Sequence, residues 1–301
     1  MYHKMKKKKK QSKILSIILI IIFLVGLSVM LYPTVSNYIN TKHQSYAIAK
    51  YDEQINNMDD TRYNEIMGQA HDYNERLKQL SSPLTSKDGL PSDYNSVLDI
   101  TGTGIMGYVT IPQIQIQLPI YHGTSEAVLN IAVGHLEGSA LPIGGEGNHA
   151  VLSAHRGLPS AKLFSDLDKL VVGDLFTVTI LNEVLTYEID RILIVKPYEM
   201  ENLARENGQD YITLLTCTPY GVNTHRLLVR GKRIETEAPE MQVRVSADAV
   251  QIERIVVASI VVIPMLVLTF ILMMIIASIR NRRKKKGKHH GIKVGDEDEM
   301  L

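Results

Sequence analysis

The sequence is poor in cysteine, has almost no net charge and shows no internal repeat. Cys217 is the only cysteine among 301 residues, so a disulfide within the chain is excluded. The formal net charge is +1 and 22% of the residues are charged, as in an ordinary globular chain. Composition therefore excludes few classes of protein, and the distribution of residues along the chain is more informative.

Two long apolar runs lie near the ends of the chain. The first extends from Ile14 to Tyr32 and the second from Ile255 to Ile279, and about 20 apolar residues suffice for a helix to cross a bilayer. Lysine and arginine cluster before the first run and after the second, which favours the cytoplasmic side for both termini. The sequence therefore predicts two transmembrane helices, with the residues of about 33 to 254 outside the cell. Pro264 inside the second run is tolerated in a membrane helix.

Both ends allow a second interpretation. The first run could be a cleaved signal peptide, but no clear A-x-A site follows it, so an uncleaved anchor is predicted. The basic runs could indicate nucleic-acid binding, but beside apolar spans they are topology signals, and no nucleic-acid partner is expected. The predicted terminal segments are a cytoplasmic N-terminus, 1–13, a transmembrane helix, 14–32, a linker, 239–254, a second transmembrane helix, 255–279, and a cytoplasmic basic tail, 280–301.

The segment 33–80 has the pattern of amphipathic helices. Apolar residues and tyrosines recur at helical spacing from Ile48 to Leu77, with a break near residues 56–60, and Asp60 or Thr61 could cap the second helix. The stretch 81–96 that follows is rich in Ser, Pro, Gly and Asp, which is typical of a loop.

The segment 97–238 has the pattern of a β domain. Short runs rich in β-branched residues, bounded by Gly, Pro and Asn, predict strands and together an all-β barrel or sandwich. The runs are 104–112, 115–122, 148–155, 174–180, 184–195, 211–217 and 225–234. Two short helices are predicted between them, over 125–133 and 160–170.

Cys217 stands at the end of a predicted strand and opens a loop. A lone cysteine is most often a small buried hydrophobe. A nucleophilic one needs a base or a lowered pKa, and donors for the oxyanion of a tetrahedral intermediate. His155 also ends a strand and opens a loop, so the two side chains could meet at one rim of a barrel.

The cation for such a site is predicted to be Arg226. It begins the strand that returns after Cys217, and its guanidinium stays charged and offers several donors. His225 is adjacent, but neighbouring residues on a strand point to opposite faces, so only one of the two can face the cleft. Arg230 is a competitor for the same role. The residues thus point to Cys–His–Arg chemistry outside the cell, with no cofactor and no metal.

The motif TLLTCTPYGVNTHRLLVRG, residues 213–231, resembles the active-site signature of sortases, T-L-x-T-C followed by Arg. With residues 134–148 and 153–167 it resembles class C, the pilus-associated sortases, and the resemblance covers about residues 35–279. It implies a mainly β fold: a closed eight-stranded barrel with short helices, here with an N-terminal helical segment and two transmembrane helices. Carried over residue by residue, it implies Cys217 as nucleophile, His155 as general acid and base, and Arg226 for substrate positioning and the oxyanion.

The resemblance also implies a reaction and a location. The thiolate would attack the Thr–Gly bond of an LPxTG-like sorting signal on a pilin or other surface protein, and an amine would resolve the thioacyl enzyme. The acceptor amine would be a pilin lysine, or a cell-wall precursor in a housekeeping-type anchoring enzyme. The protein would be embedded in the membrane of a Gram-positive bacterium, with the catalytic domain outside.

One feature departs from the family pattern. Class C sortases usually carry a lid with an Asp-Pro-aromatic motif over the active site, and the stretch 81–96 has no Asp-Pro pair. Ser82, Pro83 and Leu84 could occupy the place of that motif, or a functional lid could be absent. Asp88 or Asp93 is not expected to substitute for the missing aspartate.

Two other classes of function remain open from the residues alone. YHGTSE at 121–126 faintly resembles the HGT of L,D-transpeptidases, but their S-x-G-C motif is missing. A non-enzymatic pilus assembly scaffold with an inert cysteine would tolerate Cys217→Ala, whereas an enzyme would not.

Overall fold

The structure is a computed structural model that describes residues 2–81, 83–86, 88–236, 267 and 270, and side chains from residue 18 onward. The chain divides into two compact units, Met1–Ala249 and Val250–Leu301, and all features below belong to the first. The linker 239–254, the tail 280–301 and most of the second apolar run lie outside the described residues, so the second transmembrane helix stays a prediction.

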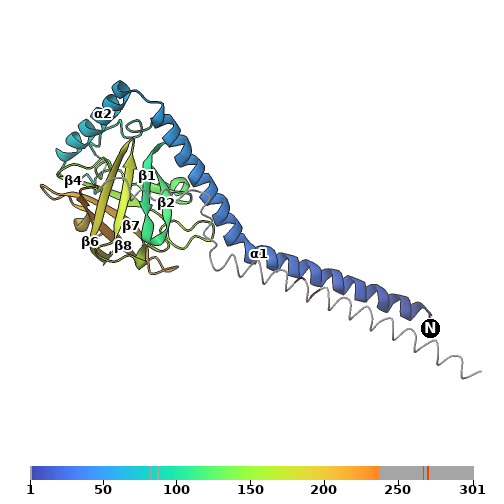
Figure 1. Cartoon of the computed structure of the whole chain (residues 1–301). Helices are drawn as coiled ribbons and strands as arrows, with labels where there is room; N and C mark the ends of the chain where they lie inside the picture. The colour runs from blue at the N-terminus through green and yellow to red at the C-terminus, as the bar shows by residue number, and fades with distance from the viewer. Residues whose placement is uncertain (1, 82, 87, 237–266, 268–269, 271–301) are drawn as a thin grey trace, which may run out of the picture. The chain divides into compact units, whose positions relative to one another are not determined.

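The first apolar run and the first amphipathic segment form one continuous helix, α1 (Tyr2–Asn56), which Figure 1 shows leading to the folded domain. The predicted boundary at residue 33 is not a break, because Pro33 lies inside the helix without ending it. Within the described residues one helical stretch, Ile18–Asn56, is long and apolar enough to cross a membrane.

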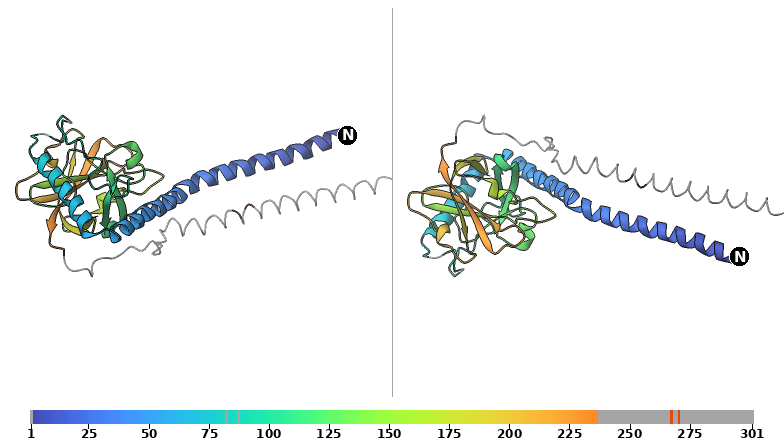
Figure 2. Two further views of the ribbon diagram at one scale, coloured as in Figure 1. Left: turned by 90° about the horizontal axis from the view of Figure 1, so that it is seen from above. Right: turned by 90° about the horizontal axis from the view of Figure 1, so that it is seen from below.

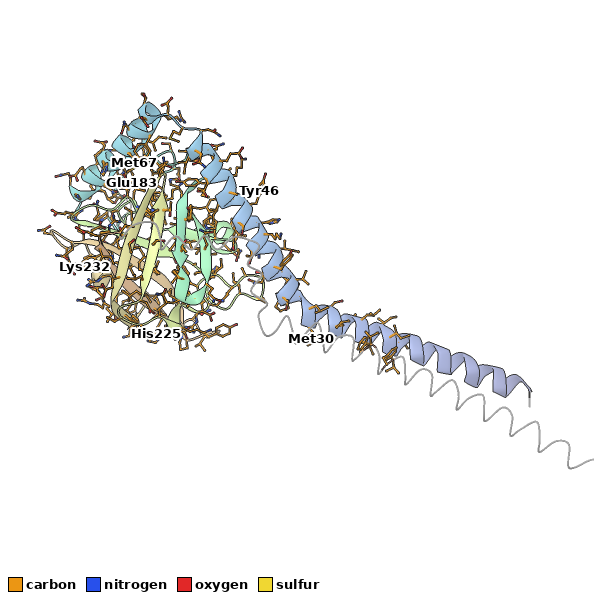
Figure 3. All side chains as sticks on the ribbon, viewed as in Figure 1. Met30, Tyr46, Met67, Glu183, His225 and Lys232 are labelled. Atoms are coloured by element: carbon orange, nitrogen blue, oxygen red, sulfur yellow. The ribbon has the colours of Figure 1, made fainter. Side chains whose placement is uncertain are left out.

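The second helix, α2 (Asp60–Lys78), follows a short break at the predicted place. Its cap is Asp59, whose Oδ1 accepts a hydrogen bond from the Arg62 amide at 2.8 Å, so the prediction of Asp60 or Thr61 was wrong by one or two residues. The apolar stripe of α2, from Ile66 to Leu77, is buried as expected. Tyr63 reaches across to Glu183 of the barrel at 2.8 Å, and Figure 3 shows Met67 and Glu183 at one end with His225 at the other.

Eight strands close into a barrel in the order β1-β2-β3-β4-β7-β8-β6-β5, which confirms the predicted eight-stranded barrel. The strands are β1 (Ile105–Ile111), β2 (Ile116–His122), β3 (Val133–His135), β4 (Asn148–Ser153), β5 (Leu175–Ile180), β6 (Glu183–Val195), β7 (Asp210–Thr218) and β8 (His225–Ile234). The pairs β2–β3 and β4–β7 are parallel and the others antiparallel. Figure 2 shows the barrel from above and below.

The short elements between strands differ partly from the prediction. Helix α3 (Glu126–Leu129) starts at the Ser125 cap, inside the predicted 125–133, and residues 130–132 form a turn and a bend. Strand β3 begins at Val133 and was missed because it has only three residues. The helix predicted over 160–170 is wrong: turns lead there to a single 3-10 turn, η2 (Leu167–Lys169). Ala161, Leu163 and Phe164 are buried, and they fill the core from a loop rather than from a helix face.

Candidate active site

The parallel pairing of β4 with β7 brings His155 to the level of Cys217. Ser153 pairs with Leu215 at the end of this ladder, and the Ala154 amide still donates to the Leu215 carbonyl at 3.1 Å. The Thr216 hydroxyl also donates to the Ala154 carbonyl at 2.8 Å. His155 is the next residue after Ala154, so it lies at the end of this ladder, and it lines the same pocket as Cys217. The predicted meeting of the two strand ends is confirmed.

The antiparallel pairing of β7 with β8 brings in the arginine. Cys217 is directly opposite Arg226, and Thr218 is opposite His225. Arg226 Nη1 donates to the carbonyls of Asn223 and His225, at 3.2 and 3.1 Å. Among the described residues the guanidinium has no carboxylate partner, so Nε and Nη2 are left to face a ligand.

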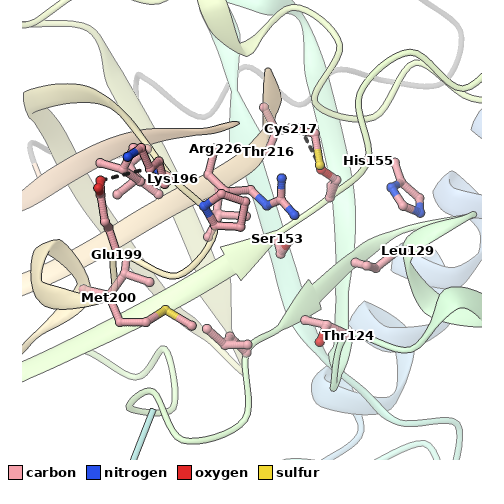
Figure 4. A pocket seen from close by; sticks show the side chains of 17 residues that line it. Thr124, Leu129, Ser153, His155, Lys196, Glu199, Met200, Thr216, Cys217 and Arg226 are labelled. Atoms are coloured by element: carbon pink, nitrogen blue, oxygen red, sulfur yellow. Dashed lines mark hydrogen bonds between the residues drawn. The ribbon is translucent and has the colours of Figure 1, made fainter. Parts of the chain in front are cut away.

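These three side chains line one pocket of about 280 Å³. Figure 4 shows Cys217, His155 and Arg226 in the same part of this pocket. His225 does not line it, as the alternation of the strand requires. The remaining wall is largely apolar, with Leu129, Leu136, Val195, Met200, Leu203, Leu215 and Leu228. Such a pocket suits an extended peptide with apolar side chains, held next to a sulfur, an imidazole and a cation.

The other candidate residues are engaged elsewhere. Arg230 is buried, binds Asp190 at 2.6 Å and Glu206 at 3.1 Å, and lies over the Tyr211 ring. Its donors are therefore committed to a structural ion pair, and it is not available as the cation of the pocket. His149 is buried between the Ala204 carbonyl and the Thr213 hydroxyl, and burial lowers its pKa.

The remaining β-domain histidines are also structural. His135 is fully buried, and burial lowers its pKa to about 4, so it is neutral at physiological pH. Its ring binds Tyr94 and the Ala140 carbonyl. Both ring nitrogens of His122 lie at carbonyl oxygens, those of Gly104 and Val97. His155 is thus the histidine that the fold brings to Cys217.

Arg156, the neighbour of His155, has a role at the site that was not predicted from the sequence. Its side chain donates to Asp168 at 2.5 Å and to the Thr218 hydroxyl at 3.3 Å, and lies near the Tyr220 ring. It therefore links the loop that follows His155 to the strand end that carries Cys217. The signal was present, since the arginine adjoins the candidate histidine in the motif. The segment from Lys196 to Leu203, which forms one wall of the pocket, was missed because it looked like an ordinary loop.

The loop 81–96 lies beside the pocket wall. None of its described residues lines the Cys217 pocket, and Ser82 lies outside the described residues. Leu84 packs on an apolar cluster that includes Leu203 and Met200. Gly138 has φ +93°, and a Cβ there would overlap the Pro83 carbonyl, so this contact requires glycine. Asp93 pairs with Arg76 rather than Arg226, as expected.

Known proteins share this fold and these motifs. The family model for the sortase domain matches residues 109–234. The structure of sortase C1 from Streptococcus agalactiae is 55% identical with a TM-score of 0.60, and the match covers 64% of this chain and 100% of that one. The chain belongs to the sortase family.

Two further sortases are similar to this chain at lower sequence identity. Sortase C of Streptococcus pneumoniae, whose structure was described with regard to catalysis and pilin substrate specificity, is 45% identical, with a TM-score of 0.57 over 64% of this sortase and 99% of that chain. Sortase A of Streptococcus agalactiae is 28% identical over 57% of this sortase and 75% of that protein. This sortase is therefore a cysteine transpeptidase that acts on surface proteins, and its structural relatives include class C enzymes. Sortases are membrane-associated in Gram-positive bacteria, and α1 is compatible with that location.

Proposed function

We propose that this sortase cleaves an LPxTG-like sorting signal between Thr and Gly and transfers the acyl group to a pilin lysine. The observation that carries the proposal is the shared pocket of Cys217, His155 and Arg226 beside an apolar wall. Cys217 lies in β7 and Arg226 in β8, and His155 follows the end of β4 by two residues; these three strands are neighbours in the barrel.

In the first half-reaction the Cys217 thiolate attacks the Thr carbonyl carbon and forms a C–S bond. The carbonyl oxygen becomes an oxyanion, and the free N–H groups of Arg226 donate to it, because preorganised donors stabilise charge that develops in the transition state. The C–N bond to Gly then breaks, and the His155 imidazolium gives its proton to the leaving nitrogen. The product is a thioester on Cys217.

In the second half-reaction an amine attacks the thioester carbon. His155, now neutral, takes a proton from the attacking nitrogen, and the Cys217 thiolate leaves as the new amide forms. Proton and sulfur return to their starting states, so neither cofactor nor metal is consumed.

A pilin lysine is the proposed acceptor because class C enzymes are among the structural relatives, at 45 to 55% identity for the two reported above. Transfer to a cell-wall precursor amine, as in a housekeeping-type enzyme, is the second candidate, supported by the more distant sortase A match. A scaffold without catalysis is disfavoured because it gives no reason for the three side chains to share one pocket.

Mass spectrometry of the enzyme after incubation with an LPxTG-type peptide tests the nucleophile. We expect a thioester adduct on the peptide fragment that contains Cys217, and none in Cys217→Ala. Wild-type protein without adduct at high peptide concentration would contradict the mechanism.

The acceptor is tested by competition. A purified pilin with its sorting signal and a cell-wall stem peptide with a free amine are supplied together at equal concentration. We expect pilin multimers linked by isopeptide bonds to dominate. Predominant transfer to the stem peptide would instead assign the anchoring function.

A further inference from the structure

One face of α1 carries three amide side chains shortly after its apolar run. Asn37, Asn40 and Gln44 are spaced by three and four residues, so they lie on one face of the helix. Along the same face Ile48 and Tyr51 are buried against the barrel, and the Tyr51 hydroxyl donates to the Met106 carbonyl at 2.8 Å. This face of α1 is therefore amide-bearing near the apolar run and apolar further on.

Each of the three amides makes a hydrogen bond with the backbone of a loop. Asn37 Oδ1 accepts from the Lys162 amide at 2.8 Å. Asn40 Nδ2 donates to the Ser160 carbonyl at 2.7 Å. Gln44, which is buried, donates through Nε2 to the Ile131 carbonyl at 2.7 Å. All three distances are those of well-formed N–H···O bonds.

The segments that receive these bonds border the candidate active site. Lys162 and Ser160 belong to the loop that starts at His155 and is closed by a bond from the Phe164 amide to the His155 carbonyl at 3.2 Å. Ile131 follows α3, whose neighbourhood supplies Thr124 and Leu129 to the pocket. The amide face of α1 thus binds the two segments that lie after β2 and after β4.

The bonds lie close to the end of the apolar run. Asn37 and Asn40 follow Tyr32 by five and eight residues, which corresponds to about 8 and 12 Å of helix. The imidazole of His155 has no hydrogen-bond partner among the described residues, so its position depends on the backbone that carries it. Loops are the most mobile parts of a fold, and the reaction rate falls steeply when a catalytic group is misplaced.

We propose that Asn37 and Asn40 are positioning residues, which make the anchor helix a support for the His155 loop, and that Gln44 supports the segment after α3 in the same way. The effect on rate rests on the function proposed above, whereas the support of the loop does not. The amides bind backbone atoms, so their contribution is independent of the side chains that the loop carries. In this view α1 is both the anchor and one side of the active-site framework.

The bonds allow a matched pair of isosteric substitutions in the full chain. Asn40 donates, so Asn40→Asp replaces the donor by an oxygen that faces the Ser160 carbonyl. Asn37 accepts, so Asn37→Asp adds the same charge to the same helix but keeps the bond. Gln54→Glu changes an exposed residue of α1 and serves as a further control.

Two readouts are measured for each variant: hydrogen–deuterium exchange over residues 155–164, and kcat and KM for LPxTG peptide cleavage. For Asn40→Asp we expect roughly tenfold faster exchange in this segment and roughly tenfold lower kcat, with KM changed less than about twofold. Asn37→Asp and Gln54→Glu should match the wild type in both. If Asn40→Asp does not fold, Asn40→Ala removes the same donor and has the same expected result.

Unchanged exchange over residues 155–164 in Asn40→Asp, or in Asn40→Ala if that variant is used, would overturn the support of the loop. Faster exchange with unchanged kcat would overturn the positioning role. If kcat fell equally in Asn37→Asp and Asn40→Asp, the added charge and not the lost donor would be the cause, and the proposal would also be overturned. If the wild type does not cleave the peptide, the proposed substrate is wrong, and the exchange comparison still decides whether α1 holds the loop.

Discussion

Cys217 and Arg226 face each other across the β7–β8 ladder as a directly opposed pair. Side chains of such a pair lie on the same face of the sheet, within about 5.5 Å at Cβ. The guanidinium is anchored through one nitrogen to two backbone carbonyls, which orients the rest of its fork. This single pairing explains why a thiol and a cation nine residues apart in sequence share a pocket.

Arg226→Lys should therefore lower kcat strongly with little effect on stability. Lysine keeps the charge but presents one rotating ammonium in place of the fixed fork. We expect a loss of roughly 100-fold in kcat for peptide cleavage, as for removal of an oxyanion donor, and a melting temperature within about 3 °C of the wild type. Steady-state kinetics and calorimetry measure the two quantities, and a variant with near wild-type kcat would remove Arg226 from the mechanism.

Arg156 should act as a link between two loops, and its partner Asp168 allows a double-mutant cycle. Arg156→Met and Asp168→Asn each remove the 2.5 Å ion pair. The arginine side chain is 9% exposed and the aspartate 47%, so screening limits the pair to a coupling of about 1 kcal/mol. Denaturant unfolding of the two single variants and the double variant measures it, and strictly additive effects would show that the pair is not coupled.

Leu84→Ala should leave peptide cleavage within about twofold of the wild type. Leu84 packs beside the pocket wall, and no described residue of 81–96 lines the pocket around Cys217. Gly138→Ala, which clashes with Pro83, should displace the loop and serves as the comparison. Strong activation by either substitution would show that the loop restrains access to Cys217 and that a lid operates without the Asp-Pro-aromatic motif.

The sequence predicted those parts of the molecule whose secondary structure follows from a local pattern of residues. The alternating β-branched runs predicted seven strands within one or two residues, and strand β8 was predicted at its observed bounds. Strand β3 could not be found, because three residues are too few to show a period. The helix expected over 160–170 failed because its apolar residues fill the core from turns, a tertiary effect that local spacing does not contain.

Some residues of the candidate site could likewise be predicted from the sequence, and others could not. Strand ends and motif order were sufficient to select Cys217, His155 and Arg226, since the ladders follow from the strands that carry them. Arg230 could be set aside only once its burial and its two carboxylate partners were known. The amides of α1 were invisible in the sequence because their partners are backbone atoms about 90 to 125 residues away.

Stability should fall as the pH is lowered through the slightly acidic range, and His135 should account for part of the fall. Burial is the main cause that lowers its pKa from 6.5 to about 4 in the folded state. The unfolded chain therefore binds a proton below pH 6.5 that the folded chain does not bind until about pH 4. The stability contributed by neutral His135 is complete above pH 6.5 and is lost between these two values.

For this one residue the loss between pH 7 and pH 5 is about 2 kcal/mol. His135→Gln keeps a donor for the Ala140 carbonyl, which the ring nitrogen of His135 contacts at 2.8 Å, but it cannot titrate. Its free energy of unfolding should be lower than that of the wild type at pH 7 and should change less with pH. Urea unfolding at several pH values measures how the free energy of unfolding of wild type and His135→Gln changes with pH. His43→Gln, on the exposed surface of α1, is the control. If the free energy of unfolding changed with pH equally in wild type and His135→Gln, the pKa of His135 in the folded state would be its ordinary one, contrary to its complete burial.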